Sequence, residues 1–422
     1  MRKARRCGAP KCTEMTSDMT DRRDLLLIYA AAFLRSSGVG VTGVLLGVYL
    51  ARAGLSTSSI GIVIAAGLVG TSAATALVGW KGDRLGRRKT LIIFALFTAV
   101  GGLALALTTR AAILLPLAVL GMINGTGTDR SAAFALEQAV IPGLTTAKSR
   151  TWSLSWYNVV LDGSGAMGAL AAGAPAMFHA RLGIAIGDAY RLAFAAFAVA
   201  NLAAAVLYAC LSERVEAARP REETAPVSER TRRIVRNLAA LFAIDAFGGG
   251  FLTDALVAYW FFQRFGVSVQ ALGVVFAVVH LLNALSHLGA AWLAQRIGLL
   301  NTMVFTHLPS SVFLILVPLA PNFHLAAALF FLREALVEMD VPTRQSYVAA
   351  VVEPQERTFA SGVTNLTRNL TWAAGSSVAG VFMQSVAFSA PLIAGGSIKI
   401  LYDALLYRAF RKVKPPEEQK HL

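Results

Sequence analysis

Residues 79–91 read Gly79-Trp80-Lys81-Gly82-Asp83-Arg84-Leu85-Gly86-Arg87-Arg88-Lys89-Thr90-Leu91, a dense charged turn between two long apolar runs. The runs on either side cover roughly residues 59–80 and 90–108 and contain no charged residue. A charged turn between two uncharged apolar stretches indicates a short hydrophilic loop that joins two membrane-spanning helices.

The composition of the whole chain agrees with a membrane protein. The 422 residues are 56% hydrophobic and 15% charged, with a mean hydropathy of +0.59, which excludes an ordinary soluble domain. A helix needs about 20 apolar residues to cross a bilayer core about 30 Å thick. Twelve stretches meet this need, at roughly 24–50, 59–80, 90–108, 111–141, 152–176, 191–211, 237–262, 270–293, 302–319, 323–350, 359–386 and 389–409. Because backbone polar groups in lipid must bond within their own segment, we predict an all-α membrane protein with twelve transmembrane helices.

The basic residues are unevenly placed along the chain. With the N-terminus in the cytosol, 28 of the 39 Lys and Arg fall in cytosolic stretches and five in outer loops. This asymmetry follows the positive-inside rule and places both termini in the cytosol. The net charge of +15 therefore has a topological cause, and we expect no nucleic-acid partner.

The chain also repeats itself with an offset near 212 residues. The matching pairs are Trp80 and Trp292, Arg84 and Arg296, Gly86 and Gly298, Thr90 and Thr302, Gly54 and Gly266, and Gly61 and Gly273. The repeat predicts two pseudo-symmetric six-helix bundles. The second copy has lost the charges of the first, since Asp83 becomes Gln295 and Arg87-Arg88 become Leu299-Leu300.

The stretch 79–91 resembles the loop between transmembrane helices 2 and 3 of the major facilitator superfamily, whose pattern reads roughly G-x-L-A-D-R-x-G-R-K-x-x-L. The fitting residues are Gly79, Asp83, Arg84, Gly86, Arg87, Arg88 and Leu91, whereas Lys81 stands where the family usually has Leu. The resemblance implies a secondary transporter that works by alternating access, with helices 1, 4, 7 and 10 lining a central cavity.

The resemblance also implies a conformational latch formed by Gly79, Asp83, Arg84, Gly86 and Arg87. In it Asp83 would meet the positive N-terminal end of helix 11, and Arg87 would bind carboxylates and helix-end carbonyls. The alternative is that these charges only set the topology. That alternative suits Asp83 less well, because the positive-inside rule counts only Lys and Arg.

These patterns divide the chain into five parts. We expect a basic cytosolic tail (1–23), an N-terminal bundle (24–211), a polar linker (212–236), a C-terminal bundle (237–411) and a cytosolic tail (412–422). The linker contains Pro220 and Pro226 and is expected to be flexible or partly helical.

Charged residues inside the spans are expensive and should face a cavity or a partner. Arg35 precedes Gly38 and Gly40 much as Asp245 precedes Gly248 and Gly250, so the two occupy matching places in helices 1 and 7. We expect Arg35 and Asp245 to face each other and bind substrate, with Asp254 and Tyr259 further out. The alternative is a structural ion pair between Arg35 and Asp245 that locks the bundles together.

Helices 4 and 10 carry further charges in their inner halves. By the resemblance we expect a cytosolic gate network of Asp129, Arg130, Asp340 and Arg344, in which Arg344 lies four residues after Asp340 and can pair with it within the helix. The family pattern R-x-x-x-G is incomplete after Arg130, which argues against a coupling role for this residue.

Proton coupling needs a carboxylate that can be protonated, and a neighbouring Arg opposes this. Glu137, Asp162 and Asp254 have no Arg within one helical turn in the sequence, so they are the proton-coupling candidates. For each of them the alternative is a polar group that is simply satisfied in the fold.

No phosphate loop, nucleophile elbow or metal-protease motif is present, so we expect neither an enzyme nor a cofactor or metal. Cys7, Cys12 and Cys210 are expected to be free thiols. The segment 339–347, with Glu356-Arg357-Thr358 and Asn365, resembles a subgroup of bacterial permeases, which implies the bacterial inner membrane.

The expected function is proton-coupled transport of a small solute by a monomer in the bilayer, with efflux favoured over uptake. The rival hypothesis is a non-transporting membrane sensor or scaffold on the same fold.

Overall fold

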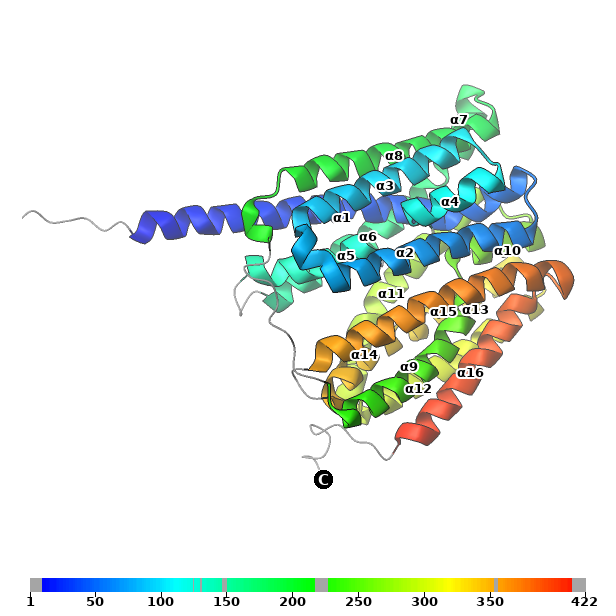
Figure 1. Cartoon of the computed structure of the whole chain (residues 1–422). Coiled ribbons are helices and arrows are strands. Elements are labelled where there is room, and N and C mark those ends of the chain that lie inside the picture. The colour runs from blue at the N-terminus through cyan, green and yellow to red at the C-terminus, as the bar shows by residue number, and fades with distance from the viewer. Residues whose placement is uncertain are drawn as a thin grey trace, which may run out of the picture.

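The computed structural model describes residues 10–123, 125–129, 131–145, 150–216, 227–352 and 356–411. These residues are almost entirely helical, and no strand occurs among them. Figure 1 shows two groups of helices, one built from the first half of the chain and one from the second. The predicted all-α architecture of two bundles is confirmed.

The N-terminal bundle contains eight of the described α-helices. They are α1 (Pro10–Arg52), α2 (Thr57–Leu85), α3 (Arg87–Leu107), α4 (Ala111–Gly121), α5 (Ala132–Val140), α6 (Arg150–Ala171), α7 (Ala174–Leu182) and α8 (Ile186–Ala209). Two 3₁₀ turns follow α5 and α8, η1 (Ile141–Leu144) and η2 (Glu213–Val215).

The C-terminal bundle contains the other eight. They are α9 (Glu229–Gly250), α10 (Asp254–Phe265), α11 (Val269–Ile297), α12 (Leu299–Leu316), α13 (Phe323–Val337), α14 (Asp340–Val351), α15 (Arg357–Ser385) and α16 (Ala390–Phe410). A 3₁₀ turn, η3 (Val317–Leu319), follows α12. Helix α9 includes the last eight residues of the expected linker, so residues 229–236 are helical.

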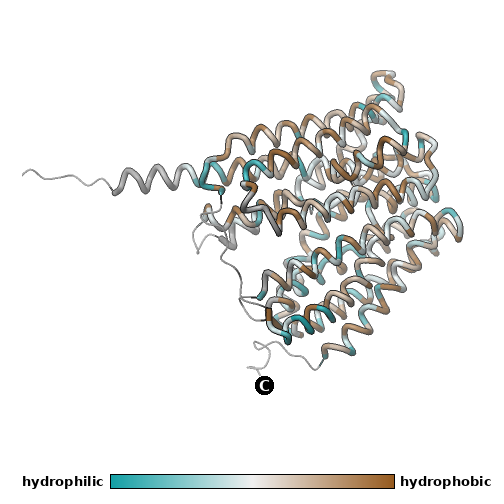
Figure 2. The backbone as a smooth tube through the Cα atoms, in the orientation of Figure 1, coloured by the Kyte–Doolittle hydropathy of each residue, from teal (hydrophilic) through white to brown (hydrophobic). Residues whose placement is uncertain are grey.

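Seven helical segments of the described chain are long and apolar enough to cross a membrane, counting α9 and α10 as one. Apolar residues run along most helices and many hydrophilic ones gather near the helix ends (Figure 2). The remaining predicted spans are broken or more polar. The predicted span 111–141 is divided into α4 and α5, and the predicted span 323–350 is divided into α13 and α14.

The break between α4 and α5 is a correction to the continuous helix expected at 111–141. Met122 ends α4 with a left-handed backbone (φ 55°), and Gly125 and Gly127 also have positive φ, at 61° and 76°. Ser131 then caps α5 by accepting a hydrogen bond from the backbone N–H of Phe134. Irregular backbone at membrane depth must be covered by protein or line a cavity, so this break marks an internal surface.

The two halves share local structure where the sequence repeats. Gly86 and Gly298 each separate two helices with nearly the same φ, 83° and 87°. The hydroxyls of Thr90 and Thr302 donate to the carbonyl oxygens of these two glycines, at 2.7 and 2.8 Å. The repeat therefore specifies the same tight interhelical turn twice, because only glycine adopts this backbone conformation cheaply.

The two bundles meet at one end of the molecule and diverge toward the other, where α1 begins and α16 ends (Figure 1). The contacts between them involve α2 with α15, α6 with α11, and α1 with α10. At the end where the bundles meet, the Ser58 N–H donates to Oε1 of Gln384 at 3.3 Å. On the orientation expected from the positive-inside rule, the joined end is the outer one and the end where the bundles stand apart is the cytosolic one (Figure 1).

Glycines bring the bundles together in these contacts. A Cβ on Gly61 of α2 would lie 2.7 Å from the carbonyl oxygen of Ser376, and one on Gly273 of α11 would lie 2.5 Å from that of Ala169. Gly61 and Gly273 are a repeat pair, so the pseudo-symmetry extends to the interface. Small residues allow such close helix approach in membranes.

Candidate functional site

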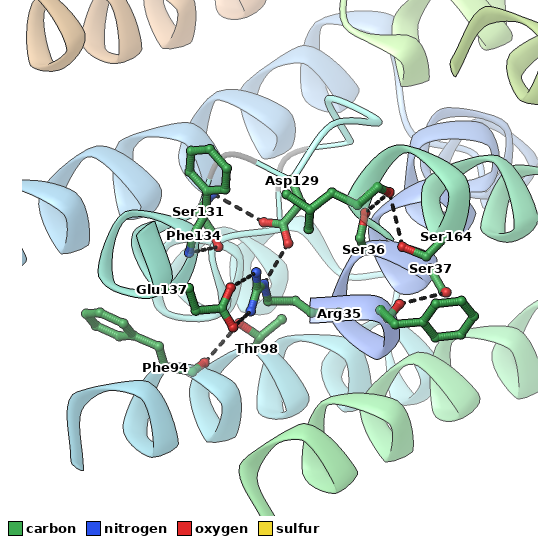
Figure 3. Close-up of polar contacts among 12 residues, drawn as sticks. Arg35, Ser36, Ser37, Phe94, Thr98, Asp129, Ser131, Phe134, Glu137 and Ser164 are labelled. Carbon is green, nitrogen blue, oxygen red and sulfur yellow. Dashed lines mark hydrogen bonds and ion pairs between the residues drawn. The ribbon is translucent and has the colours of Figure 1, made fainter. Parts of the chain in front are cut away.

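A buried ionic cluster occupies the N-terminal bundle around Arg35 of α1 (Figure 3). The Arg35 Nε atom donates to Oδ2 of Asp129 at 2.6 Å, and its two terminal nitrogens donate to the Glu137 carboxylate at 3.0 and 2.7 Å. The Arg35 side chain is 4% exposed and both carboxylates are fully buried. Planar, bidentate pairing of this kind suits a guanidinium group in a desolvated site.

Two tyrosines complete the cluster. The hydroxyls of Tyr157 on α6 and Tyr208 on α8 each donate to Glu137, both at 2.5 Å. Five elements thus converge on one charged centre: α1, the break before α5, α5, α6 and α8. A buried network whose members are all paired makes the bundle rigid, because removing any member leaves an unsatisfied polar group.

The C-terminal bundle has its own cluster around Asp245 of α9. Lys399 of α16 and Arg368 of α15 each donate to the Asp245 carboxylate at 2.7 Å. Arg344 of α14 lies 3.8 Å from the same carboxylate and also pairs with Asp340, four residues earlier. The predicted pairing of Asp340 and Arg344 within the helix is confirmed.

A histidine extends this cluster toward α16. Nδ1 of His307 lies 3.0 Å from both carboxylate oxygens of Asp403, and its Nε2 lies 3.6 Å from Asp245. Sequence reasoning missed His307, Arg368, Lys399 and Asp403. Three of them could have been found from the sequence, because Arg368, Lys399 and Asp403 are charged residues inside predicted spans. Such residues are energetically unfavourable in a membrane unless they have a partner or face a cavity.

The expected pairing of Arg35 with Asp245 is wrong. Each residue has its partners within its own bundle, and no ion pair joins the two in the described residues. The alternative of an Arg35–Asp245 lock between bundles fails for the same reason. The ion pairs described here each stabilise one bundle, and substrate binding by Arg35 or Asp245 remains a prediction.

Asp254, the first residue of α10, lies where the bundles touch. A Cβ on Gly127 would lie 1.7 Å from its Oδ2, and a Cβ on Gly43 of α1 would lie 3.4 Å from its Cβ. The next residue, Ala255, donates its backbone N–H to the carbonyl oxygen of Gly125 at 3.0 Å. The break in the fourth span of one bundle therefore docks on the break in the seventh span of the other.

The surroundings of Asp254 are rich in acidic groups. Its carboxylate lies 3.9 Å from Nε2 of His280 on α11, too far for a hydrogen bond, and its electrostatic neighbours include Glu334, Glu338 and Arg333. Arg333 pairs with Glu334. The Asp254 side chain is 17% exposed, which makes it more accessible than Glu334 at 5% and than the carboxylates of the Arg35 and Asp245 clusters.

The other proton-coupling candidates differ from Asp254. Glu137, which has no Arg nearby in sequence, has Arg35 in space, 102 residues away. Asp162 is half-buried on α6. Tyr259 is buried on α10, where its ring packs edge-on against Phe388, and its hydroxyl accepts from Gln263 at 3.5 Å.

The latch and gate predictions are only partly within the described structure. Gly79, Asp83 and Arg84 belong to α2, but the side chains of Asp83 and Arg84, and all of Arg130, lie outside the described structure. Gly86 joins α2 to α3, and the backbone N–H of Arg87 donates to Glu216 at 2.6 Å. Asp129 belongs to the Arg35 cluster and Asp340 with Arg344 to the Asp245 cluster, so these gate candidates lie in separate networks.

A glutamate caps a helix at the cytosolic face of the second bundle. Glu356 accepts from the backbone N–H of Ser228 at 2.6 Å, from its hydroxyl at 3.0 Å and from the Thr231 hydroxyl. Ser228 is the N-cap of α9. The carboxylate thus joins the start of α9 to the start of α15, and helix N-termini favour negative charge.

Two bundles of membrane-spanning helices, each with a buried charged core, define a multi-pass membrane transporter fold. A family model described as the Major Facilitator Superfamily matches residues 28–333 and, in a second match, 238–422. The matches together cover most of the chain, and the chain belongs to this superfamily. Members of the family are transporters, so the protein is a membrane transporter and not an enzyme.

One curated relative is an uncharacterized membrane protein of Saccharomyces cerevisiae. It is 25% identical over 417 residues, which cover 91% of this chain and 93% of the yeast protein. This relative is eukaryotic, so the expected bacterial inner membrane stays a prediction.

Solved structures share the fold. A bacterial homologue of the human lysosomal transporter Spinster, in an inward-facing unoccupied conformation, has a TM-score of 0.72 at 15% identity, covering 93% of this chain and 97% of that one. The nucleoside transporter NupG gives 0.72 at 13% identity over 92% and 99% of the two chains. A D-xylose–proton symporter gives 0.69 at 16% identity over 92% and 97%. At these identities the likeness shows the fold alone.

Proposed function

We propose that this protein is a secondary transporter that moves a small solute by alternating access and couples this movement to protons at Asp254. The observation that carries the proposal is the place of Asp254. Its carboxylate belongs to one bundle and fills the space beside Gly127 of the other, at the contact that must open and close.

The arrangement of the contacts supports alternating access. The charged clusters hold each bundle together internally, whereas the bundles meet through glycines and backbone groups such as Gly61, Gly273 and the Ala255–Gly125 hydrogen bond. Separating such contacts breaks no ion pair described here. Two rigid bundles with a small-residue interface can therefore rock about a site between them.

The chemistry of Asp254 supports proton coupling. An ionised carboxylate inside a membrane protein costs at least about 2.5 kcal/mol on insertion scales unless it is paired. Among the described residues, the basic side chain within 4.0 Å of the Asp254 carboxylate is His280, at 3.9 Å, whereas Asp245 has Lys399 and Arg368 at 2.7 Å. Binding a proton removes the charge of Asp254 and with it this cost, so the proton changes the stability of the outer contact.

The other assignments follow from the same model. We infer that a monomer in a cell membrane performs this cycle, that efflux is the favoured direction, and that Asp83 and Arg87 latch the outward-open state. The outer closure in the structure is the opposite state, with the cytosolic ends of the bundles apart.

The test is transport by purified protein in proteoliposomes that contain a pH-sensitive dye. We expect solute addition to drive proton movement across the membrane, and an imposed pH gradient to drive solute accumulation. Solute movement that is indifferent to the pH gradient would remove proton coupling. No movement of any solute in a broad panel, with folded protein present, would favour a sensor or scaffold instead.

A further inference from the structure

The cluster around Asp254 contains buried polar atoms without partners. Nε2 of His280 and Oδ1 of Asn283, both on α11, have no hydrogen-bond partner in the described structure. The two residues are 3% and 8% exposed. Buried polar atoms are nearly always paired, so two such atoms on one helix, next to a pair of neighbouring carboxyl groups, indicate a site that a ligand completes.

His280 borders Asp254, and Asn283 borders Glu334, which is a neighbour of Asp254. The Nε2 atom of His280 is 3.9 Å from Oδ2 of Asp254. His280 also faces the other bundle, since its ring lies 3.8 Å from the position of a Cβ on Gly165. The site therefore sits at the junction of α10, α11 and α13 with the N-terminal bundle.

The available groups are mostly acceptors. Asp254 offers a carboxylate, Asn283 offers a carbonyl oxygen, and a neutral His280 can offer a ring nitrogen. The formal charge is also negative, because Asp254 and Glu334 share one cationic neighbour, the guanidinium of Arg333, which already pairs with Glu334. A complementary ligand is positively charged and rich in hydrogen-bond donors.

We propose that this site binds an organic ammonium group, which makes the transported solute a primary or secondary amine. An ammonium nitrogen can lie about 2.8 Å from both Asp254 Oδ2 and His280 Nε2, because two atoms 3.9 Å apart can share one donor nitrogen. A metal ion fits less well, since no group of three His, Cys, Asp or Glu in the described residues is placed to hold one.

This inference names the substrate class of the transport proposed above and rests on it. It also gives that proposal a direction. If the solute and the proton both bind Asp254, each displaces the other, so inward movement of a proton is exchanged for outward movement of the amine.

The experiment measures thermal unfolding of the purified full-length chain at fixed, near-neutral pH with four probes of similar shape. They are phenethylammonium, its trimethylammonium analogue, phenethyl alcohol and hydrocinnamate, which offer a cationic donor, a cation without donors, a neutral group and an anion. A ligand that binds the folded state raises the unfolding temperature with its concentration. We expect phenethylammonium to stabilise the protein in a saturable way, and the trimethyl analogue to bind about tenfold more weakly because it cannot donate hydrogen bonds.

Variants locate the binding. Asp254→Asn should weaken phenethylammonium binding more than about tenfold, and Asn283→Ala by a smaller factor. Asp188→Asn is the matched control, because Asp188 is an exposed acidic residue near the outer end of α8 that pairs with Arg191. It should bind like the parent protein.

Three results overturn the inference: stabilisation by hydrocinnamate in preference to the amine, amine binding that Asp254→Asn leaves unchanged, or stabilisation by none of the cations. None of these three results bears on proton coupling, which the proteoliposome measurement tests separately. Conversely, amine binding at Asp254 without any transport supports the site and removes the transport proposal.

Discussion

Asp254 and Gly127, one from each bundle, fit together so closely that a Cβ on Gly127 would lie 1.7 Å from Oδ2 of Asp254. Gly127 also has a positive φ of 76°, which residues other than glycine rarely adopt. The glycine is therefore required twice, by its backbone and by the carboxylate that packs against it.

We predict that Gly127→Ala displaces Asp254 and weakens the outer contact. Overpacking and backbone strain should cost about 1–3 kcal/mol of stability, and transport in proteoliposomes should fall by at least about tenfold. Gly187→Ala is the control, because no atom lies within 4 Å of a Cβ there. Equal behaviour of the two variants would show that the Asp254–Gly127 contact is unimportant.

The repeat pair Gly61 and Gly273 gives a prediction about conformation. Valine at either position would strike a carbonyl oxygen of the opposite bundle, so Gly61→Val and Gly273→Val should destabilise the outer closure and favour the outward-open state. A cysteine introduced at Ser58, with the native cysteines replaced, should then react several-fold faster with an impermeant alkylating reagent. Gly163→Val on α6, where a Cβ meets no atom within 4 Å, should leave the rate unchanged. Slower or unchanged labelling in both interface variants would contradict the closed outer side.

The Arg35 cluster predicts a large loss of stability. Arg35→Ala leaves Asp129 and Glu137 buried without a cation, which should cost about 3–5 kcal/mol in unfolding measurements. The loss should be smaller when Glu137→Gln is added, because one uncompensated charge is removed.

The same cluster predicts that exchanging the charges of Arg35 and Asp245 does not restore folding or transport. Each residue would then face like charges in its own bundle, near Glu137 or near Lys399. Recovery of activity in Arg35→Asp/Asp245→Arg would mean that the two residues meet in another state of the cycle.

Glu356 gives a pH-dependent prediction. The hydrogen bonds from the Ser228 backbone N–H and the Thr231 hydroxyl hold the pKa of this carboxyl below its ordinary value of 4.5. A carboxyl group whose pKa is lowered in the folded state stabilises that state when the pH is above the ordinary pKa. This contribution is lost as the pH falls through the pKa of the folded state. Hydrogen exchange at the start of α9 should therefore be faster in Glu356→Gln than in the parent protein near neutral pH, and equal in strongly acidic solution. Glu229→Gln, at an exposed neighbouring position, is the control, and its exchange rate should differ less from that of the parent protein. If the difference between Glu356→Gln and the parent protein does not change with pH, Glu356 does not act as a cap.

The sequence predicted what depends on local pattern and on repetition. Apolar length specified the helices, and the turns at Gly86 and Gly298 follow from a residue type that alone tolerates their φ. The pairing of Asp340 with Arg344 followed from helical spacing. The break at 122–131 was missed although Gly125, Gly127 and the Ser131 cap are its local signals, because apolar residues on both sides suggested one continuous span.

The partners of the charged residues could not be predicted in this way. Arg35 meets Asp129 and Glu137 across 94 and 102 residues, and His307 meets Asp403 across 96. Whether residues so far apart in the sequence meet depends on which helices pack together. Helix periodicity predicts which face of a helix is buried, but it does not predict which helix packs against that face. The matching positions of Arg35 and Asp245 in the repeat placed them correctly in their own bundles, and symmetry alone does not bring equivalent residues into contact.

The most direct test of the account is proton-driven accumulation by Asp254→Asn in proteoliposomes, with solute raised to saturation to offset weaker binding. Asparagine keeps the size of the side chain and cannot exchange a proton, so the account predicts that solute exchange continues while accumulation driven by the pH gradient is lost. Asp188→Asn should keep both activities. Accumulation by Asp254→Asn at the level of the parent protein would contradict the claim that Asp254 couples the proton to transport.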